Sequence, residues 1–311
     1  MVGGTSDLVA ERPALPIAVW FRAAPRFAVS LGLLGLVFWM APEEVDWTIL
    51  MTIGPGALLV CLALSALTVA LLAWRWKMVA DRFFERPDAC PRLGAYMGIT
   101  WLSLATNQFV PTVVGGDVLR IGKLASWGLA LPRATGAVLL DRLFGLVALG
   151  LLALTGLHLV VGGEGLRTAL GAGLIVVLAG ILIFALARRY GPPLWQGLFA
   201  APLSWPQGAG LVFAAIVSHL ANIAMFLIIA QAMGVGLPIL PAIAIMSVTL
   251  FLSVLPVSIA GWGIRELSLV QAFGQIGVAA EGILLASVCY GLMVMITQAG
   301  GFLQLIGRNR P

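Results

Sequence analysis

Two short stretches of the chain combine a proline, nearby glycines, an acid and an arginine. The first runs from Asn107 to Arg120 as NQFVPTVVGGDVLR, and the second from Leu255 to Glu266 as LPVSIAGWGIRE. In each stretch the proline stops an incoming helix, and glycines permit a tight turn before the next helix begins. The start of a helix presents N–H groups and a partial positive charge, which favour anions. An arginine there adds a guanidinium that can hold a phosphate through two hydrogen bonds. Both stretches therefore predict anion-binding breaks between half-helices.

The charged residues of these stretches are spaced so that some can pair and others cannot. Asp117 and Arg120 are three residues apart and could pair on one helix face. A third stretch, GAVLLDR at 136–142, ends in adjacent charges, as does the Arg265-Glu266 pair. Adjacent helical residues do not face each other, so we expect these charges to find other partners or to line a wet cavity.

We expect the arginines of all three stretches to converge on one lipid phosphate. Arg120, Arg142 and Arg265 would bind it, and the neighbouring acids would balance them when the site is empty. The predicted substrate-binding residues are Asn107, Gly115, Gly116, Asp117, Arg120, Asp141, Arg142, Gly261, Gly263, Arg265 and Glu266.

Simpler roles compete with this hypothesis. Arg120, Lys123 and Arg142 could be anchors whose side chains extend to the membrane interface. Asn107 could satisfy backbone groups freed by a proline. The two histidines, His158 and His219, have no carboxylate or cysteine at ligand spacing, so polar packing between helices is the better interpretation and no metal site is predicted.

The composition indicates an integral membrane protein. Hydrophobic residues make up 61% of the 311 residues and charged residues 10%, whereas a soluble domain has about 25% charged residues. The basic residues are scattered between apolar runs, which argues against nucleic-acid binding. The three cysteines, Cys61, Cys90 and Cys289, are expected as thiols rather than a disulfide framework.

Apolar stretches long enough to span a membrane recur along the chain. Uncharged stretches lie at 27–42, 47–74, 93–116, 143–163, 168–187, 190–264 and 282–307. Within the longest, residues 190–208 hold four prolines and two tryptophans, which predicts an interfacial loop before a span at 210–234. We expect a cytoplasmic N-terminal segment at 1–26, with no cleaved signal peptide, and a single membrane domain at 27–307.

The distribution of Lys and Arg predicts the topology. Connections at 75–92 and 117–142 hold five and four basic residues, which places both on the cytoplasmic side. Only one apolar element separates them, so we expect a re-entrant element at about 93–125, and the same parity argument gives a second at about 238–276. The predicted fold is an all-α polytopic membrane protein. It has about six full transmembrane helices, two re-entrant broken-helix hairpins entering from opposite faces, and cytoplasmic termini. Paired broken helices are typical of transporter binding sites.

The three motifs also resemble a known family. N-x3-P-x3-GGD-x2-R, GAVLLDR-x2-G and LPVSIAGWGIRE are similar to the flippase-like family represented by the transmembrane region of lysylphosphatidylglycerol synthase, and the similarity runs from about Val29 to Leu305. It implies that the predicted site residues other than Gly115, together with Pro111 and Pro256, fall on family motif positions. Asp141 differs from the Glu of many members, and Asp117 takes a position that is Glu or Asp. The namesake has a soluble aminoacyl-transfer domain, whereas this chain ends at Pro311, so aminoacyl transfer is not expected and the lipid cannot be carried over.

The leading functional prediction is a lipid flippase or transporter. It would move an anionic phospholipid or a polyprenyl-phosphate-linked precursor between leaflets of the inner cell membrane. No nucleotide-binding loop occurs, so a gradient-coupled or facilitated mechanism is expected, with Asp117 or Glu266 as a proton carrier. We expect no enzyme activity, cofactor or metal, and a homo-oligomer is left open. The alternatives are a membrane-embedded, glycosyltransferase-like enzyme acting on a lipid phosphate, for which the acidic cluster at 43–46 is the only hint, and an accessory subunit of a cell-envelope complex.

Overall fold

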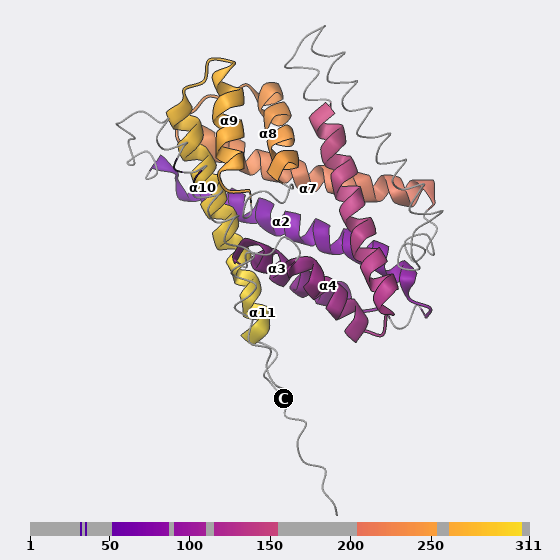
Figure 1. Cartoon of the computed structure of the whole chain (residues 1–311). Helices are drawn as coiled ribbons and strands as arrows, with labels where there is room; N and C mark the ends of the chain where they lie inside the picture. The colour runs from indigo at the N-terminus through magenta and orange to yellow at the C-terminus, as the bar shows by residue number, and fades with distance from the viewer. Residues whose placement is uncertain are drawn as a thin grey trace, which may run out of the picture.

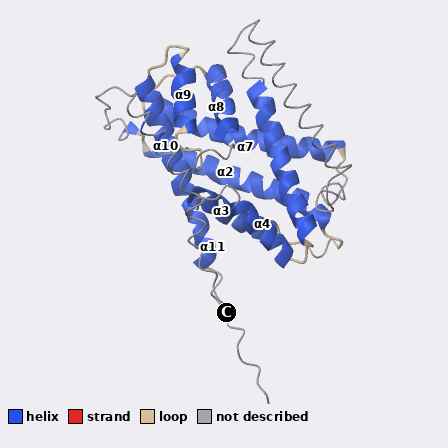
Figure 2. Ribbon diagram, in the orientation of Figure 1, coloured by secondary structure: helices blue, strands red, loops and turns tan. Residues whose placement is uncertain are grey.

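The computed structural model describes residues 32, 35, 52–86, 90–109, 115–154, 204–253 and 261–306. All regular elements in these ranges are helices (Figure 2), which confirms the predicted all-α class. The expected span at 27–42 apart from residues 32 and 35, the expected span at 168–187, and the residues of both breaks around Pro111 and Pro256 lie outside the described residues.

Four helices of the described part are long and apolar enough to cross a membrane, so the protein is a multi-pass membrane protein. These helices are α2 (Pro55–Ala80) continued by η2 (Asp81–Phe83), the helix Leu131–Leu154, α7 (Trp205–Ala232), and α10 (Ala280–Ala299) continued through η4 (Gly300–Phe302) and α11 (Leu303–Ile306).

Three predicted boundaries are wrong. The span expected at 47–74 continues to Ala80, and the span expected at 143–163 begins at Leu131, inside the predicted connection 117–142. Both expectations ended a span at its first charged residue, Arg75 or Arg142, but each of these arginines is paired with an aspartate of another helix. The loop expected to extend to Gly208 ends earlier, because α7 begins at Trp205 with Pro206 in its first turn, where proline is well tolerated.

Among the helices labelled in Figure 1, α2 and α7 make the most extensive contact, and they cross the middle of the molecule. Around them lies a core of large apolar side chains that also draws on α8, α9 and α10. Its fully buried members include Ile223, Phe226, Met246, Leu269 and Ile283. This core fixes the position of the second half of the chain relative to α2.

Two pairs of shorter helices pack around this centre. In each pair the second helix runs back toward the end at which the first helix begins. The first pair is α3 (Leu93–Phe109) and α4 (Gly115–Ser126), and the second is α8 (Ile239–Ser253) and α9 (Ile264–Gly274). Tyr96 near the start of α3 lies 5.1 Å, between ring centroids, from Trp127 just after α4. Before α8, Val235 packs against Gly282 at the start of α10. Both pairs are therefore hairpins.

The two hairpins begin at opposite ends of the α2–α7 pair. Thr52 Oγ1, just before α2, donates a hydrogen bond to the carbonyl of Ala232 at the end of α7, at 3.0 Å. The first hairpin follows the far end of α2, whereas the second follows the end of α7. In Figure 1, α3 and α4 accordingly lie on one side of this pair, and α8 and α9 on the other.

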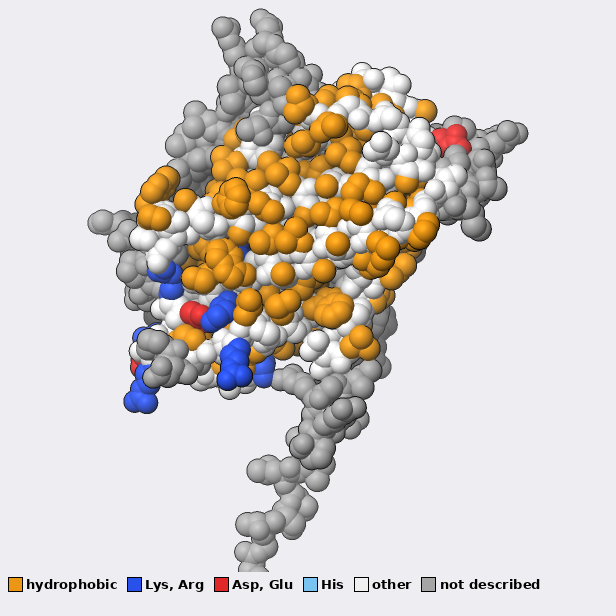
Figure 3. Space-filling view, turned by 180° about the vertical axis from the view of Figure 1, so that it is seen from behind, with side chains coloured by type: hydrophobic (Ala, Val, Ile, Leu, Met, Phe, Trp, Pro, Cys, Tyr) orange, Lys and Arg blue, Asp and Glu red, His pale blue; other side chains and the backbone are white. Residues whose placement is uncertain are grey.

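The surface of the molecule is divided by polarity. Figure 3 shows apolar side chains over most of one face, with Lys and Arg side chains gathered at its lower end. Large side chains such as Leu59, Phe213 and Ile296 are exposed, as expected for a surface that contacts lipid tails. This gathering of basic residues at one end is the charge asymmetry on which the predicted topology rests.

Candidate functional site

Three arginines and two aspartates meet where α2, α4 and the helix Leu131–Leu154 come together. We call Arg75, Arg120, Arg142, Asp117 and Asp141 the arginine–aspartate cluster. Arg75 Nε donates to Asp141 Oδ1 at 2.6 Å, and Arg120 Nη1 donates to Asp141 Oδ2 at 3.2 Å. Arg142 donates to Asp117 Oδ1 through Nε at 3.1 Å and Nη2 at 2.8 Å. The cluster thus has a net charge of +1.

Asp141 is the centre of the buried half of this cluster. It is fully buried, and the two arginines that share its carboxylate are only 4% and 5% exposed. Burying ions is costly unless they are paired and hydrogen-bonded. The pairing of both oxygens of Asp141 with Arg75 and Arg120 therefore explains how a charged residue can sit inside the helix Leu131–Leu154.

Arg120 is buried but not saturated with hydrogen bonds. Its Nε has no hydrogen-bond partner among the described residues, and neither does Nε1 of Trp76. The guanidinium carbon of Arg120 lies 5.1 Å from the centroid of the Trp76 ring, which is a favourable cation–π distance. A third unpartnered atom, Thr100 Oγ1, lies one helical turn along α3 from Tyr96, whose ring packs edge-on against Trp76. The Nε of Arg120 and the Nε1 of the neighbouring Trp76 are thus donors available to an acceptor such as a phosphate oxygen.

The other half of the cluster is accessible. The Arg142 side chain is 43% exposed and that of Asp117 is 18% exposed. The cluster therefore has a partly exposed part, the Asp117–Arg142 pair, and a buried part, Asp141 with Arg75 and Arg120. An anion could reach the Asp117–Arg142 pair without unfolding any helix.

The expected pairing of Asp117 with Arg120 is wrong, because each turns to the helix Leu131–Leu154 instead. The adjacent Asp141 and Arg142 bind different partners, as predicted. Sequence reasoning missed Arg75, which it assigned to a cytoplasmic connection. The available signal was the apolar pattern of Ala73, Trp76 and Val79, which continues past Arg75 and indicates that the helix does not end there.

Asn107 and Gly116 join the two helices of the first hairpin. The Gly116 N–H donates to Asn107 Oδ1 at 2.8 Å, so Asn107 caps the start of α4. A Cβ on Gly116 would lie 2.5 Å from the carbonyl oxygen of Ser103 on α3. Gly115 begins α4, and both glycines are helical. In this hairpin Gly116 permits close helix packing rather than the predicted tight turn.

A second group of charges lies at the start of α9 in the other hairpin. Arg265 and Glu266 form an ion pair with each other, and both are buried. The Ser287 hydroxyl donates to Glu266 Oε1 at 3.0 Å, and Glu266 Oε2 accepts the Gly263 N–H at 2.7 Å. The Arg265 guanidinium carbon is 4.7 Å from the Trp262 ring centroid and 5.4 Å from that of Tyr290.

The expectation that Arg265 and Glu266 must find other partners is wrong. Glu266 turns back to cap Gly263, and this places its other oxygen beside the flexible Arg265 side chain. The turn before α9 does use glycine as predicted: Gly261 and Gly263 have φ values of 81° and 88°, which side chains with a Cβ rarely adopt. Gly291 on α10 leaves the space that Arg265 and Trp262 occupy.

The structure places the predicted site residues in two groups. Among the described residues, the ion pairs and hydrogen bonds of Arg265 go to Glu266 and Ser287, and none joins it to the arginine–aspartate cluster. In the described ranges no group of three or more His, Cys, Asp or Glu side chains could hold a metal ion. His219 Nε2 lies 3.2 Å from the carbonyl oxygen of Gly145, and His158 lies outside the described residues.

Comparison with known protein families matches residues 24–299 to the lysylphosphatidylglycerol synthase TM region. The match covers nearly all of the chain, including both hairpins and the cluster. The chain belongs to this family. The resemblance drawn from its motifs is thereby confirmed. No curated protein compared with the chain matches it. Membership of the lysylphosphatidylglycerol synthase TM-region family identifies a membrane domain, and the site's chemistry must be argued from its own residues.

Proposed function

We propose that this protein moves an anionic lipid or lipid-linked precursor between the leaflets of the inner cell membrane. The observation that supports this most is the positive surplus of the arginine–aspartate cluster, in which Arg120 is buried with its Nε unpartnered in the described part of the chain. A buried unpaired donor on a charged group costs free energy. A phosphate that accepts this hydrogen bond removes that cost and neutralises the surplus charge.

The two halves of the cluster suit a stepwise exchange. A phosphate first displaces Asp117 from the exposed Arg142, and then competes with Asp141 for Arg120. The aspartates hold the arginines in place when the site is empty, because unpaired charge at membrane depth is expensive. The proposal assigns no catalytic step to the chain.

The hairpin arrangement supports the same proposal. We take α3–α4 and α8–α9 as re-entrant elements that begin at opposite faces of the membrane. Broken helices of this kind lie at the substrate sites of secondary transporters, where one half of the protein moves against the other. The cluster uses α4 of the first hairpin, and the Arg265–Glu266 pair begins α9 of the second. Each hairpin thus carries charge that movement could expose.

The test is lipid translocation in proteoliposomes, using a short-chain fluorescent phosphatidylglycerol and chemical quenching of the outer leaflet. We compare the wild type with Arg120→Gln and Arg120→Lys. Arg120→Gln keeps the Arg75–Asp141 pair, so the fold should persist, and it removes one charge from the cluster. We expect translocation to fall about tenfold or more, which corresponds to about 1.4 kcal/mol of lost phosphate binding. Arg120→Lys should recover part of the rate.

The matched control is Arg133→Gln, which removes an exposed arginine paired with Glu85. Exposed pairs contribute little, so its rate should stay within about twofold of the wild type. Melting temperatures in detergent report whether each variant is folded. A wild type that moves neither phosphatidylglycerol nor a polyprenyl phosphate, or an Arg120→Gln variant that is folded and fully active, would overturn the proposal.

A further inference from the structure

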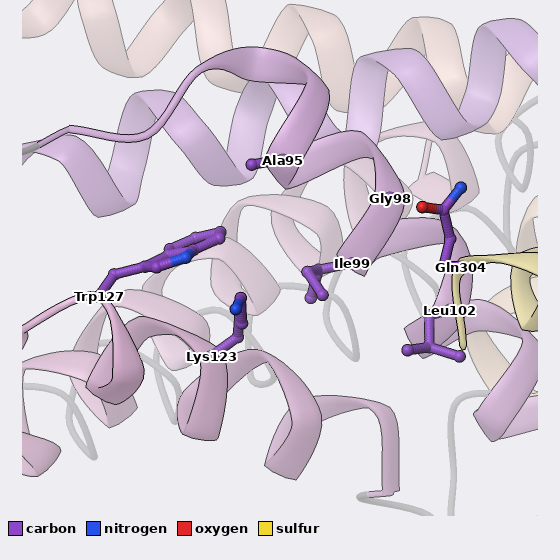
Figure 4. Close-up of a pocket in the computed structure, with 7 residues that line it drawn as sticks. All are labelled: Ala95, Gly98, Ile99, Leu102, Lys123, Trp127 and Gln304. Carbon is purple, nitrogen blue, oxygen red and sulfur yellow. The ribbon is translucent and has the colours of Figure 1, made fainter. Parts of the chain in front are cut away.

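A cavity lies apart from the arginine–aspartate cluster, where α3, the end of α4 and α11 meet. Its volume is about 250 Å³. Figure 4 shows Lys123 and Trp127 toward one end of this pocket, Gln304 toward the other, and Ile99 between them. Apolar atoms of Ala95 and Leu102 complete the wall. We call this the Lys123 pocket.

The chemistry of the pocket favours an anion. Among the described residues that line it, Lys123 is the only charged one, so its ammonium is the group that an anion in the pocket would meet. The Lys123 ammonium lies 5.4 Å from the centroid of the Trp127 ring. Gln304 adds an amide that can both donate and accept hydrogen bonds. Lys123 follows Arg120 by three residues on α4, but Arg120 turns inward to Asp141, so the pocket is distinct from the arginine–aspartate cluster.

The surroundings of the pocket favour a lipid over a soluble anion. Its volume is below the roughly 300–1,000 Å³ of sites that enclose whole ligands, so it can take a headgroup and leave the rest outside. The surface beside it is apolar: Leu93 and Met97 are exposed on α3, and Leu303 and Leu305 on α11. Acyl chains could lie against this surface while the phosphate meets Lys123. Tryptophan is also a residue typical of the depth at which headgroups lie.

We infer that the Lys123 pocket binds the phosphate headgroup of an anionic phospholipid in the leaflet at the basic end of the molecule. Lys123 pairs with the phosphate, and Gln304 bonds to polar groups of the headgroup or to the ester carbonyls. Ile99 and Leu102 contact the first carbons of the chains. This binding does not depend on translocation, so it stands whether or not the arginine–aspartate cluster carries lipid.

The chain offers an internal control for a direct test, because Lys77 and Lys123 are its only two lysines. Lys77 pairs with Asp81 and donates to the Pro91 carbonyl at 3.1 Å, and it does not line the pocket. Purified protein in an uncharged maltoside detergent is acetylated with an N-hydroxysuccinimide ester, and both lysines are followed by peptide mass spectrometry. With dioctanoyl phosphatidylglycerol at about ten times its Kd, we expect Lys123 acetylation to slow about tenfold relative to Lys77.

Two variants separate pocket binding from a general effect of negative charge. Gly98→Leu fills the pocket, and its first added atom meets only the flexible end of Gln304, so the fold should persist and the protection of Lys123 should disappear. Gly150→Leu makes the same change where nothing lies within 4 Å and should keep the protection.

The ligand panel completes the test. Dioctanoyl phosphatidylcholine and sn-glycerol 3-phosphate at the same concentration should leave Lys123 unprotected. Equal protection by phosphatidylcholine would remove the role of charge, and equal protection by glycerol phosphate would make the pocket a site for soluble anions. Parallel slowing of both lysines, or protection that survives Gly98→Leu, would likewise overturn the inference.

Discussion

Asp141 is shared by two buried arginines, so these three side chains must be considered together. Its carboxylate accepts from Arg75 on one oxygen and from Arg120 on the other. Removing one partner of a buried ion pair costs about 3–5 kcal/mol, because the remaining charge stays buried without compensation. Asp141→Asn leaves two arginines in that state, whereas Arg75→Met leaves Asp141 with Arg120.

We therefore predict that Asp141→Asn lowers the melting temperature more than Arg75→Met, and that the double variant recovers part of the loss. The coupling in such a cycle should be about 0.5–3 kcal/mol, as found for residues in direct contact. Thermal unfolding in detergent measures all four proteins. Additive losses would show that Arg75 and Asp141 do not interact, which would contradict their ion pair.

Among individual residues, the sequence predicted which side chains belong to the site but not all of their partners. The motifs gave Asp117, Arg120, Asp141 and Arg142 as site residues, and the structure brings these four together. The sequence did not reveal Arg75 as a partner of Asp141, because the two residues are 66 positions apart. Their pairing depends on how three helices pack. The Arg265–Glu266 pair was excluded by helix periodicity, but a residue that caps its own helix does not obey that periodicity.

At the scale of elements, the breaks in the two hairpins were predictable because proline and glycine act locally. Helix ends were less predictable, since a charged residue ends a span only when it has no partner within the protein. Arg75 and Asp141 pair with each other and so extend two helices past their expected ends. Gly116 also has a different role from the one predicted, since it permits close helix packing rather than a tight turn.

The packing role of Gly116 gives a prediction with a control on the same helix. Gly116→Ala puts a methyl group 2.5 Å from the Ser103 carbonyl oxygen, so α3 and α4 must separate. Overpacking of this kind costs about 1–3 kcal/mol. Gly122→Ala on α4 has open space within 4 Å and should be neutral or stabilise the helix by up to about 1 kcal/mol.

The measurement is again the melting temperature in detergent, together with lipid translocation. We expect Gly116→Ala to melt earlier than the wild type and to translocate more slowly, because α4 carries Asp117 and Arg120. Equal melting temperatures for Gly116→Ala and Gly122→Ala would mean that the two helices are not in close contact at this point.

At the scale of the whole molecule, the charge distribution and the two hairpins together predict the membrane topology. The α3–α4 hairpin starts and ends near Tyr96 and Trp127, at the end where basic side chains gather. The α8–α9 hairpin starts near Val235 and ends before Gly282, which are in contact. If both hairpins are re-entrant, each must begin and end on the same face of the membrane, and the two faces must differ.

Cysteine labelling tests this claim. Single cysteines at Cys90 and Ser126→Cys mark the two ends of the first hairpin, and Gln231→Cys and Gln275→Cys mark those of the second. Both glutamines and Ser126 are exposed. With the other native cysteines replaced, we expect a membrane-impermeant maleimide to label positions 90 and 126 only from the cytoplasmic side, since that side carries the basic residues. Positions 231 and 275 should be labelled only from the opposite side.

The alternative topology gives a different pattern. If α3 and α4 together crossed the membrane as one span, positions 90 and 126 would be labelled from opposite sides, and the positive charge of Lys123 and Arg133 would lie outside. Right-side-out and inside-out vesicles distinguish the two patterns in one experiment. The labelling pattern has a direct consequence for the proposed function. Only the re-entrant pattern places the Asn107–Gly116 break within the membrane while both ends of its hairpin remain in cytoplasmic water. Labelling of 90 and 126 from one side would therefore locate the start of α4, and with it Asp117 and Arg120, where a headgroup must pass to change leaflets.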